Sequence, residues 1–412
     1  MTFDSSHGNE FHIHKSNGTK RVFQQWSHGL YYMDTKATGI TFVNTVEGNK
    51  SKYSNHNYSH AVLARNIQKM IGIDIGTRFI KAVILEKSGA QYSLQAFACE
   101  PILGNAFAER EIKDFEAVSH ALKKVKLALK SKNKLVAIAV SGSTVLNKIV
   151  YMDPGQTDHE LESQIELEAD SLIPYPLNEV YIDFEQISNS QTTNNKVEVL
   201  LSAVHRELVD RRITLLGEVG YEAKIVDVEN YALGAAVASL YPHETKEIVC
   251  CINIGASHLQ MCSIKDGQVI YAKDHNFGMD ALIQDLMMLY SQERSQIEQQ
   301  LTDGTLPETW KQEVYPMFLA NLQQNINQAL QVYISASGEG RPGSLLICGG
   351  GGYLTSLPED LSADLGIEVI CFNPFSNMTI AENVNQVDLE QVAGQLIIAA
   401  GLASRSFQPW HI

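Results

Sequence analysis

The sequence predicts an α/β protein built from two related halves. Strand-like and helical segments alternate along most of its 412 residues, which is the pattern of sheets covered by helices. An apolar strand that ends in a glycine turn occurs twice, and a third apolar strand runs into the glycines of 349–352. With 44% hydrophobic residues, the chain is long enough to bury a substantial core in two or three domains.

The predicted elements begin at residue 71 and follow one another closely. Thr157 and Glu160 have the capping-box spacing that starts a helix, and Pro174 ends it. Apolar residues repeat at helical spacing in three other segments, and β-rich runs mark the strands. We expect hairpins at 71–85 and 247–264, strands at 135–140, 181–187, 197–204, 224–228 and 344–348, and helices at 114–130, 207–219 and 317–334.

The charge and cysteine content exclude several classes of function. The net charge of −15 argues against nucleic-acid binding, which requires a basic surface. No run of about 18 apolar residues is present, so a membrane-spanning helix is not expected. The first thirty residues lack the apolar core of a signal peptide, so secretion is not expected either. The six cysteines form no C-x-x-C pair, which argues against zinc and thioredoxin-like sites. A cytoplasmic location is therefore expected.

Residues 1–69 differ from the rest of the chain. They hold eight basic and four acidic residues, together with six of the 13 histidines. No strand or helix period continues through them, so we expect a polar, disordered extension. The histidines lack the spacing of metal ligands. A second possibility, that Met70 is the true start of the protein, also stays open.

The repeated glycine hairpin predicts a phosphate-binding site. Glycine turns let backbone N–H groups converge on an anion, and nearby hydroxyl groups add donors. Asp74, at the end of the first strand, is suited to hold Mg²⁺ together with phosphate oxygens. The glycine run is expected to lie against a purine and ribose, although neither a Walker nor a dinucleotide-binding pattern is present. The phosphate-binding candidates are Gly76, Thr77 and Lys81 in the first copy and Gly255 and Ser257 in the second.

These three elements resemble the phosphate-1, phosphate-2 and adenosine motifs of the actin-like ATPase superfamily. Further segments narrow the resemblance to the FtsA-like PilM family of type IV pilus assembly, and the similarity spans 71–407. It implies an actin-like, duplicated ribonuclease H-like fold of two lobes with a small inserted α+β domain of the 1C type. The segments are QIELEADSLIPYPLNEVYIDFE (164–185), AKIVDVENYAL (223–233), FGMDAL (277–282), LLICGGGGYL (345–354) and NPFSNM (373–378).

The resemblance also implies a domain organisation. Domain 1A is expected in three pieces, because the 1C domain is inserted into it and its last helix follows domain 2A. The pieces of 1A are 71–144, 223–246 and 379–412, with 1C at 145–222 and 2A at 247–378.

The implied function is that of an ATP-binding cytoplasmic scaffold. The family binds the cytoplasmic tail of the inner-membrane protein PilN and is linked through PilO and PilP to the pilus motor platform, so membrane association is expected only through partners. The resemblance implies that Asp74 coordinates Mg²⁺, with Glu229 a weaker candidate for the nucleotide site. The implied ATP contacts are Gly76, Thr77, Arg78, Lys81, Glu229, Asn253, Gly255, Ala256, Ser257, Gly349, Gly350 and Gly351.

Two positions depart from the family pattern. Asn253 stands where an aspartate is usual, and an amide has no charge and is a poor base. We therefore predict ATP binding with weak or no hydrolysis. Arg78 stands where a small residue is ordinary; it either adds positive charge near the phosphates or points to solvent.

Two other functions remain open for this fold. One is an actin-fold small-molecule kinase, which requires a catalytic carboxylate in the region of Asn253. The other is an FtsA-like filament-forming ATPase. The acidic helix at 157–172 is either a solvated face or the surface on which a PilN-like tail docks.

Overall fold

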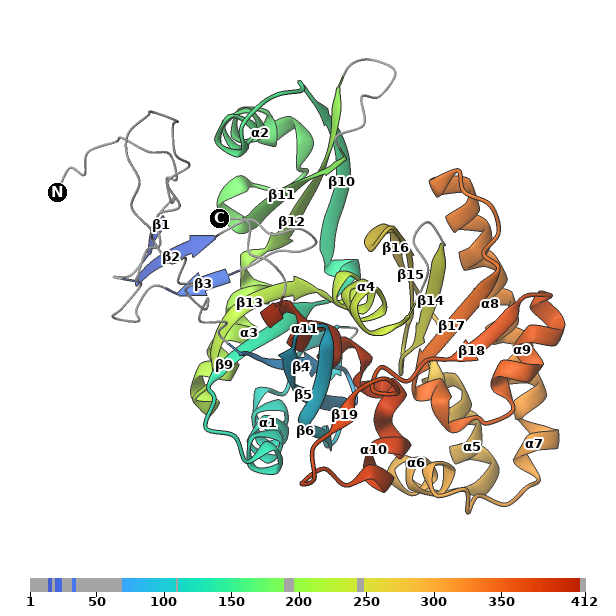
Figure 1. The fold of residues 1–412 in the computed structure, drawn as a ribbon. Coiled ribbons are helices and arrows are strands. Elements are labelled where there is room, and N and C mark those ends of the chain that lie inside the picture. Colours follow the sequence, from blue (N-terminus) through green and yellow to red (C-terminus); the bar gives the residue numbers. More distant parts are fainter. Residues whose placement is uncertain are drawn as a thin grey trace, which may run out of the picture.

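The computed structural model describes residues 69–108, 110–188, 196–242 and 248–407. It also describes the backbone of three short strands, β1 (His14–Ser16), β2 (Thr19–Phe23) and β3 (Tyr32–Asp34), which form an antiparallel sheet. The rest of the predicted N-terminal extension lies outside the described residues. The described chain forms two lobes side by side, with a smaller domain attached to the first lobe (Figure 1).

The sheet of the first lobe starts with the predicted hairpin. Its strands lie in the order β13-β9-β4-β5-β6-β19. Helix α1 (Phe115–Leu129) is capped by the side chain of Asp114 and covers one face. The strands are β4 (Ile71–Ile75), β5 (Phe79–Ser88), β6 (Gln91–Pro101), β9 (Leu135–Val140), β13 (Glu222–Val228) and the short β19 (Thr379–Ile380).

The sheet of the second lobe has the order β16-β15-β14-β17-β18. Its strands are β14 (Val249–Ile254), β15 (Leu259–Lys265), β16 (Gln268–His275), β17 (Ser344–Gly349) and β18 (Glu368–Cys371). Its helices are α5 (Met279–Tyr290), α6 (Arg294–Thr302), α7 (Trp310–Glu313), α8 (Tyr315–Ser337) and α9 (Leu357–Leu365), of which α7, α8 and α9 lie on the outer side of the lobe (Figure 1).

Apart from β19, which adds to the edge of the first sheet, the two sheets have the same topology. In each, the first three strands form an antiparallel meander, and the fourth and fifth add parallel to the first strand. The predicted internal repeat is therefore a repeat of fold, and β4–β5 and β14–β15 are equivalent hairpins. This duplicated α/β arrangement is the actin-like fold that the sequence predicts.

Two helices fill the space between the sheets. Helix α4 (Glu229–Leu240) and helix α11 (Ile397–Ser404) are apolar on most sides and share one core with residues of both lobes. A side chain at Gly401 would meet the backbone oxygen of Ala232 at 1.9 Å, so only glycine permits this approach. The chain reaches α11 through α10 (Gln386–Val392).

The inserted domain has a small core of its own. Its strands β10 (Val145–Met152), β11 (Val180–Ser188) and β12 (Val197–His205) form a sheet in the order β10-β12-β11. Helix α2 (Asp158–Leu172) begins with the predicted Thr157–Glu160 capping box and buries Leu161 against this sheet. Helix α3 (Arg206–Val219), which follows β12, packs its apolar side chains into the core of the first lobe instead.

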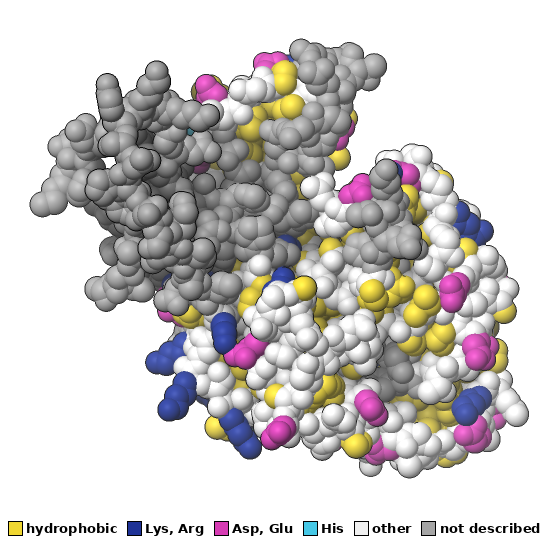
Figure 2. Space-filling view, in the orientation of Figure 1, with side chains coloured by type: hydrophobic (Ala, Val, Ile, Leu, Met, Phe, Trp, Pro, Cys, Tyr) yellow, Lys and Arg dark blue, Asp and Glu magenta, His cyan; other side chains and the backbone are white. Residues whose placement is uncertain are grey.

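Most charged side chains of the described residues lie on the surface, whereas Asp74, Arg212, Asp227 and Arg405 are buried. On the face seen in Figure 2, more Lys and Arg side chains lie over the first lobe than over the second, whereas Asp and Glu side chains are spread over both lobes. Helix α1 holds Lys123, which is exposed, and Lys124, which is half-buried. In this part of the chain, no helix combines the length and the apolar character needed to cross a membrane.

Candidate nucleotide-binding site

A cavity of about 450 Å³ lies between the two glycine hairpins. Both hairpins contribute to its wall, and so does the glycine end of β17, where Gly349 and Gly350 stand. Asp74 and Gly255, which are 181 positions apart in the sequence, therefore face one shared space. Of the residues predicted for the site, Gly351 alone is not in the wall; a side chain there would meet Ile254 at 2.9 Å and Leu357 at 3.3 Å.

The first hairpin presents an ion pair to the cavity. Asp74 and Lys81 stand opposite each other in the β4–β5 register, and the Lys81 ammonium donates to the Asp74 carboxylate at 2.6 Å. Burial alone lowers the pKa of Lys81, but the charge and hydrogen bond of Asp74 raise it above its ordinary value. The turn closes through a bond from the Gly76 N–H to the oxygen of Phe79. Lys81 is thus engaged by Asp74 rather than free.

The second hairpin presents an amide pair at the equivalent place. Asn253 stands opposite Gln260 in the β14–β15 register, and its amide donates to the Gln260 side-chain oxygen at 2.7 Å. Asn253 and Gln260 lie 179 positions after Asp74 and Lys81, respectively. The acid–base pair of the first lobe is therefore replaced by two uncharged side chains in the second lobe.

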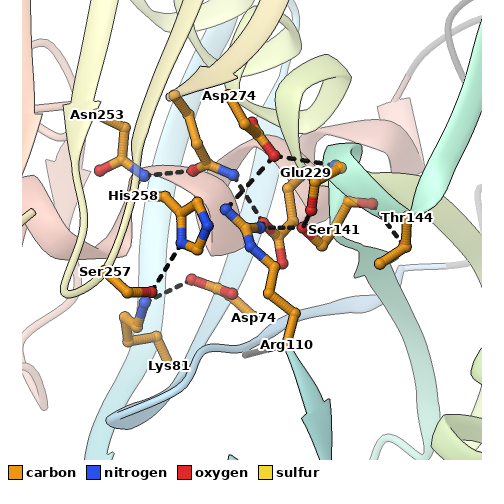
Figure 3. Close-up of polar contacts among 12 residues, drawn as sticks. Asp74, Lys81, Arg110, Ser141, Thr144, Glu229, Asn253, Ser257, His258 and Asp274 are labelled. Carbon is orange, nitrogen blue, oxygen red and sulfur yellow. Dashed lines mark hydrogen bonds and ion pairs between the residues drawn. The ribbon is translucent and has the colours of Figure 1, made fainter. Parts of the chain in front are cut away.

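A buried polar network joins this amide pair to the other lobe (Figure 3). The Gln260 amide donates to Glu229 at 2.7 Å, and Arg110 donates to the same carboxylate oxygen at 2.9 Å. Arg110 also pairs with Asp274 of β16 at 3.4 Å, while the backbone N–H of Ser143 donates to Asp274 at 3.0 Å. Burial raises the pKa of Glu229, although the Arg110 charge opposes this shift.

Arg78 lies in the cavity wall rather than on the outer surface. Its guanidinium stands 3.7 Å from the carboxylate of Asp280 at the start of α5, so it reaches across to the second lobe. Asp280 also pairs with Arg294 at 2.8 Å, and Arg294 with Glu298 at 3.0 Å. A row of paired charged side chains, contributed by both lobes, thus borders the cavity beside helix α6.

Sequence reasoning missed several residues of the wall. Gln260 could have been found by extending the repeat one strand further, because it is the counterpart of Lys81. His258 lies in the second turn, where its ring bonds the Ser257 hydroxyl at 2.8 Å, and burial together with the Arg110 charge lowers its pKa. Arg110, between β7 (Phe107–Ala108) and β8 (Glu111–Ile112), and the cavity face of α6 belong to no recognisable motif.

The donor set suits magnesium held jointly with a ligand. No group of three His, Cys, Asp or Glu able to hold a metal occurs among the described residues. Asp74 and Glu229 both reach the cavity wall, and Mg²⁺ typically takes one or two carboxylates with phosphate oxygens and water. The residues present therefore fit Mg²⁺ bound with a phosphate chain better than a metal held by protein alone.

Comparison with known proteins identifies the family. The family model for "Type IV pilus assembly protein PilM" matches residues 72–407. The solved "PilM-PilN type IV pilus biogenesis complex" is similar with a TM-score of 0.70 at 20% identity, covering 83% of this chain and 99% of that chain. The ethanolamine utilization protein EutJ from Carboxydothermus hydrogenoformans aligns with a TM-score of 0.48 at 14% identity, over 81% and 88% of the two chains. MreB5 of Spiroplasma citri bound to ADP aligns at 0.44 and 12% identity, over 83% and 99%. The match to the family model extends over most of the chain, and the chain therefore belongs to the PilM family of type IV pilus assembly proteins.

Proposed function

We propose that this protein binds ATP with Mg²⁺ in the cavity between its lobes and acts as a scaffold of the type IV pilus assembly platform. The nucleotide half of this proposal, ATP binding, rests on the cavity, which has a glycine hairpin from each lobe in its wall. Backbone N–H groups of such turns suit a chain of phosphates. Lys81 and Arg78 supply positive charge at the first turn, and Ser257 supplies a hydroxyl at the second.

In this proposal the residues divide into three groups. Asp74 holds the metal, with Glu229 behind it. Thr77, Ala256 and Ser257 hold the phosphates together with Gly76 and Gly255, while Gly349 and Gly350 allow the adenosine to lie close to the backbone of β17. Gly351 supports that turn by packing beneath it. Mg²⁺, when bound, neutralises phosphate charge.

Hydrolysis is expected to be slow or absent. Phosphoryl transfer depends on positioning and on charge around the reacting phosphate, and the second hairpin offers only the Asn253–Gln260 amide pair there. Glu229 is the nearest carboxylate in the same network, but it accepts bonds from both Gln260 and Arg110.

The scaffold half of the proposal concerns a partner. The similar solved structure is a complex of PilM with PilN, and this chain covers 99% of the aligned chain. We therefore propose that the cytoplasmic tail of a PilN-like inner-membrane protein binds here, and that PilO and PilP are reached only through it. The protein would then lie at the cytoplasmic face of the inner membrane.

ATP binding is tested by equilibrium measurements with Mg²⁺ on the wild type, Lys81→Ala and Lys87→Ala. Both lysines are on β5, but Lys87 is exposed and outside the cavity wall. Lys81→Ala should weaken ATP binding about tenfold or more, because a charge-assisted phosphate contact is lost, and Lys87→Ala should leave it unchanged. Absence of ATP binding in the wild type would refute the nucleotide half.

The partner is tested with a synthetic peptide of the cytoplasmic tail of a PilN-like protein from the same organism. Binding of the peptide supports the scaffold, and a scrambled peptide of the same composition is the control. Multiple-turnover phosphorylation of a sugar or other metabolite would instead identify a kinase, and ATP-dependent sedimentation would identify a filament.

A further inference from the structure

The cavity wall holds one buried cation that the phosphate motifs do not explain. Arg212, on helix α3, is only 5% exposed and lines the cavity. Its Nε has no hydrogen-bond partner. Its one described bond runs from Nη1 to the backbone oxygen of Leu208 at 3.3 Å, which is long for a hydrogen bond.

A second buried arginine shows what a structural role looks like in this protein. Arg405 is 3% exposed and binds the Asp227 carboxylate through two nitrogens, at 2.7 and 2.6 Å. Arg212 has no such partner among the described residues, since none of their carboxylates lies within 4.0 Å of its guanidinium. A buried charge that no carboxylate contacts directly is costly, so Arg212 indicates a place for an external anion.

The neighbours of Arg212 indicate which part of a ligand it would meet. The charges that act on it most strongly are those of Glu229, Arg110 and Asp74. Asp74 is occupied by Lys81, and Glu229 by Arg110 and Gln260. Glu229, Arg110 and Asp74 lie on the first-lobe side of the cavity. Gly349 and Gly350, where we propose the adenosine to lie, belong to the second lobe.

We propose that Arg212 binds the terminal phosphate of a nucleoside triphosphate and makes the site prefer ATP to ADP. This inference rests on the proposed nucleotide site and names its selectivity residue. A nucleotide whose base lies at the glycine turn of β17 runs its phosphates between the two hairpins, so the last phosphate is the group that reaches Arg212. A diphosphate leaves the guanidinium unpaired.

The position of Arg212 also links the nucleotide to the inserted domain. Helix α3 directly follows β12 of that domain and packs into the core of the first lobe. Binding of the terminal phosphate therefore anchors the helix through which the inserted domain returns to the first lobe. ADP lacks this anchor.

The first test compares affinities for ATP and ADP, each with Mg²⁺, in the wild type and in Arg212→Gln. The matched control is Arg211→Gln, because Arg211 is the next residue of α3, is outside the cavity wall and pairs on the surface with Glu207. Arg212→Gln should weaken ATP binding about tenfold or more, the effect of one lost bond to a charged group. ADP binding should change less than about twofold, and Arg211→Gln should alter neither.

The second test measures the melting temperature of Arg212→Met without nucleotide. Removing an uncompensated buried charge should leave it unchanged or raise it, whereas a structural arginine should lower it. A marked loss of stability, or an equal loss of ATP and ADP affinity in Arg212→Gln, would overturn the role of Arg212. If the wild type binds neither nucleotide, the proposed function fails as well, and this outcome is distinct because it precedes any substitution.

Discussion

At the scale of single residues, the most informative difference between the lobes is the pair on each first hairpin. Asp74–Lys81 and Asn253–Gln260 occupy equivalent registers and are bonded at 2.6 and 2.7 Å. The two side-chain hydrogen bonds have nearly the same length and place on the hairpin, but the pair in the second lobe carries no charge. A side chain on Gly349 would meet the Asn253 oxygen at 2.3 Å, so the amide also lies against the predicted adenosine turn.

The change Asn253→Asp should increase ATP hydrolysis. It restores a carboxylate at the strand end, where it can order water or metal next to the phosphates. The Gln260 amide is then expected to turn toward the new carboxylate and to release Glu229 from one of its two donors. Phosphate release under multiple turnover measures the effect, and a rise of about tenfold or more is expected.

Asn321→Asp is the control for that prediction, because Asn321 is exposed on α8 and is not part of the cavity wall. An unchanged rate in Asn253→Asp, with ATP still bound, would contradict the interpretation of this position.

The departure of Asn253 from the aspartate of the family pattern could be seen in the sequence. Its bond to Gln260 could not, because the strand register that sets it depends on the length of the turn.

The pH dependence of stability should include a contribution from His258. Burial and the Arg110 charge lower its pKa in the folded protein, so below the ordinary value of about 6.5 the unfolded chain binds more protons than the native state. Stability is therefore lost as the pH falls from 7 toward 5. Melting temperatures between pH 5 and 8 should decrease less steeply on the acid side in His258→Gln than in the wild type.

His120→Gln is the matched control, since His120 is exposed on α1. The same acid slope in His258→Gln and the wild type would contradict the assignment. His275 adds to the slope in both proteins, because burial lowers its pKa as well.

At the scale of elements, the helices and strands that local signals predicted lie close to the observed ones, but strands β6, β10, β16 and β18 were not predicted. Asp114 and Lys130 cap α1 where the sequence predicted the helix to lie, and the Thr157 capping box starts α2. Local signals predicted none of the helices α4, α5, α6, α7, α9, α10 and α11, although the family resemblance implied a last helix within 379–412. Helix α11 is apolar on nearly every side because it lies between two sheets, so it carries no amphipathic period by which it could be recognised.

The packing of α11 predicts a steep cost for a single methyl group. A Cβ at Gly401 would lie 1.9 Å from the oxygen of Ala232 on α4, so Gly401→Ala must push the two helices apart. We expect a loss of about 1–3 kcal/mol or more in the free energy of unfolding. Urea denaturation measures it.

Gly217→Ala is the control for this element. Gly217 is helical within α3, and nothing lies within 4 Å of an added Cβ there. The added methyl group should raise stability by up to about 1 kcal/mol, because alanine favours a helix. Equal effects at Gly217 and Gly401 would show that the contact between α4 and α11 is not as close as described.

At the scale of the whole molecule, the duplicated topology explains why a site could be predicted at all. Two copies of one hairpin, 179 positions apart, become opposite walls of one cavity because the sheets that carry them have the same strand order. The residues that join the lobes were not predictable in this way. Arg110 and Asp274 meet through tertiary packing alone. The strand registers make Cys99 the counterpart of Asp274, but the two lie at different spacings after Lys81 and Gln260, so the sequence repeat does not reveal the match.

The contact of Asp274 with the first lobe predicts a coupling between lobe closure and the inserted domain. Asp274 belongs to the second lobe, yet it accepts the backbone N–H of Ser143, which lies in the turn just before β10, and pairs with Arg110. Asp274→Ala should therefore free this turn. Because a bond to a charged group contributes about 1.5–3 kcal/mol, amide exchange around Ser143 should become about tenfold faster or more. Hydrogen–deuterium exchange of a peptide covering 141–152 measures this, and Asp364→Ala, on the exposed side of α9, is the control.

Nucleotide should slow exchange of the same peptide in the wild type and much less in Asp274→Ala. In the variant, the second lobe lacks the Asp274 carboxylate through which it would hold the turn when the lobes close. Exchange that is equally fast in both proteins would mean that the inserted domain is held by the first lobe alone.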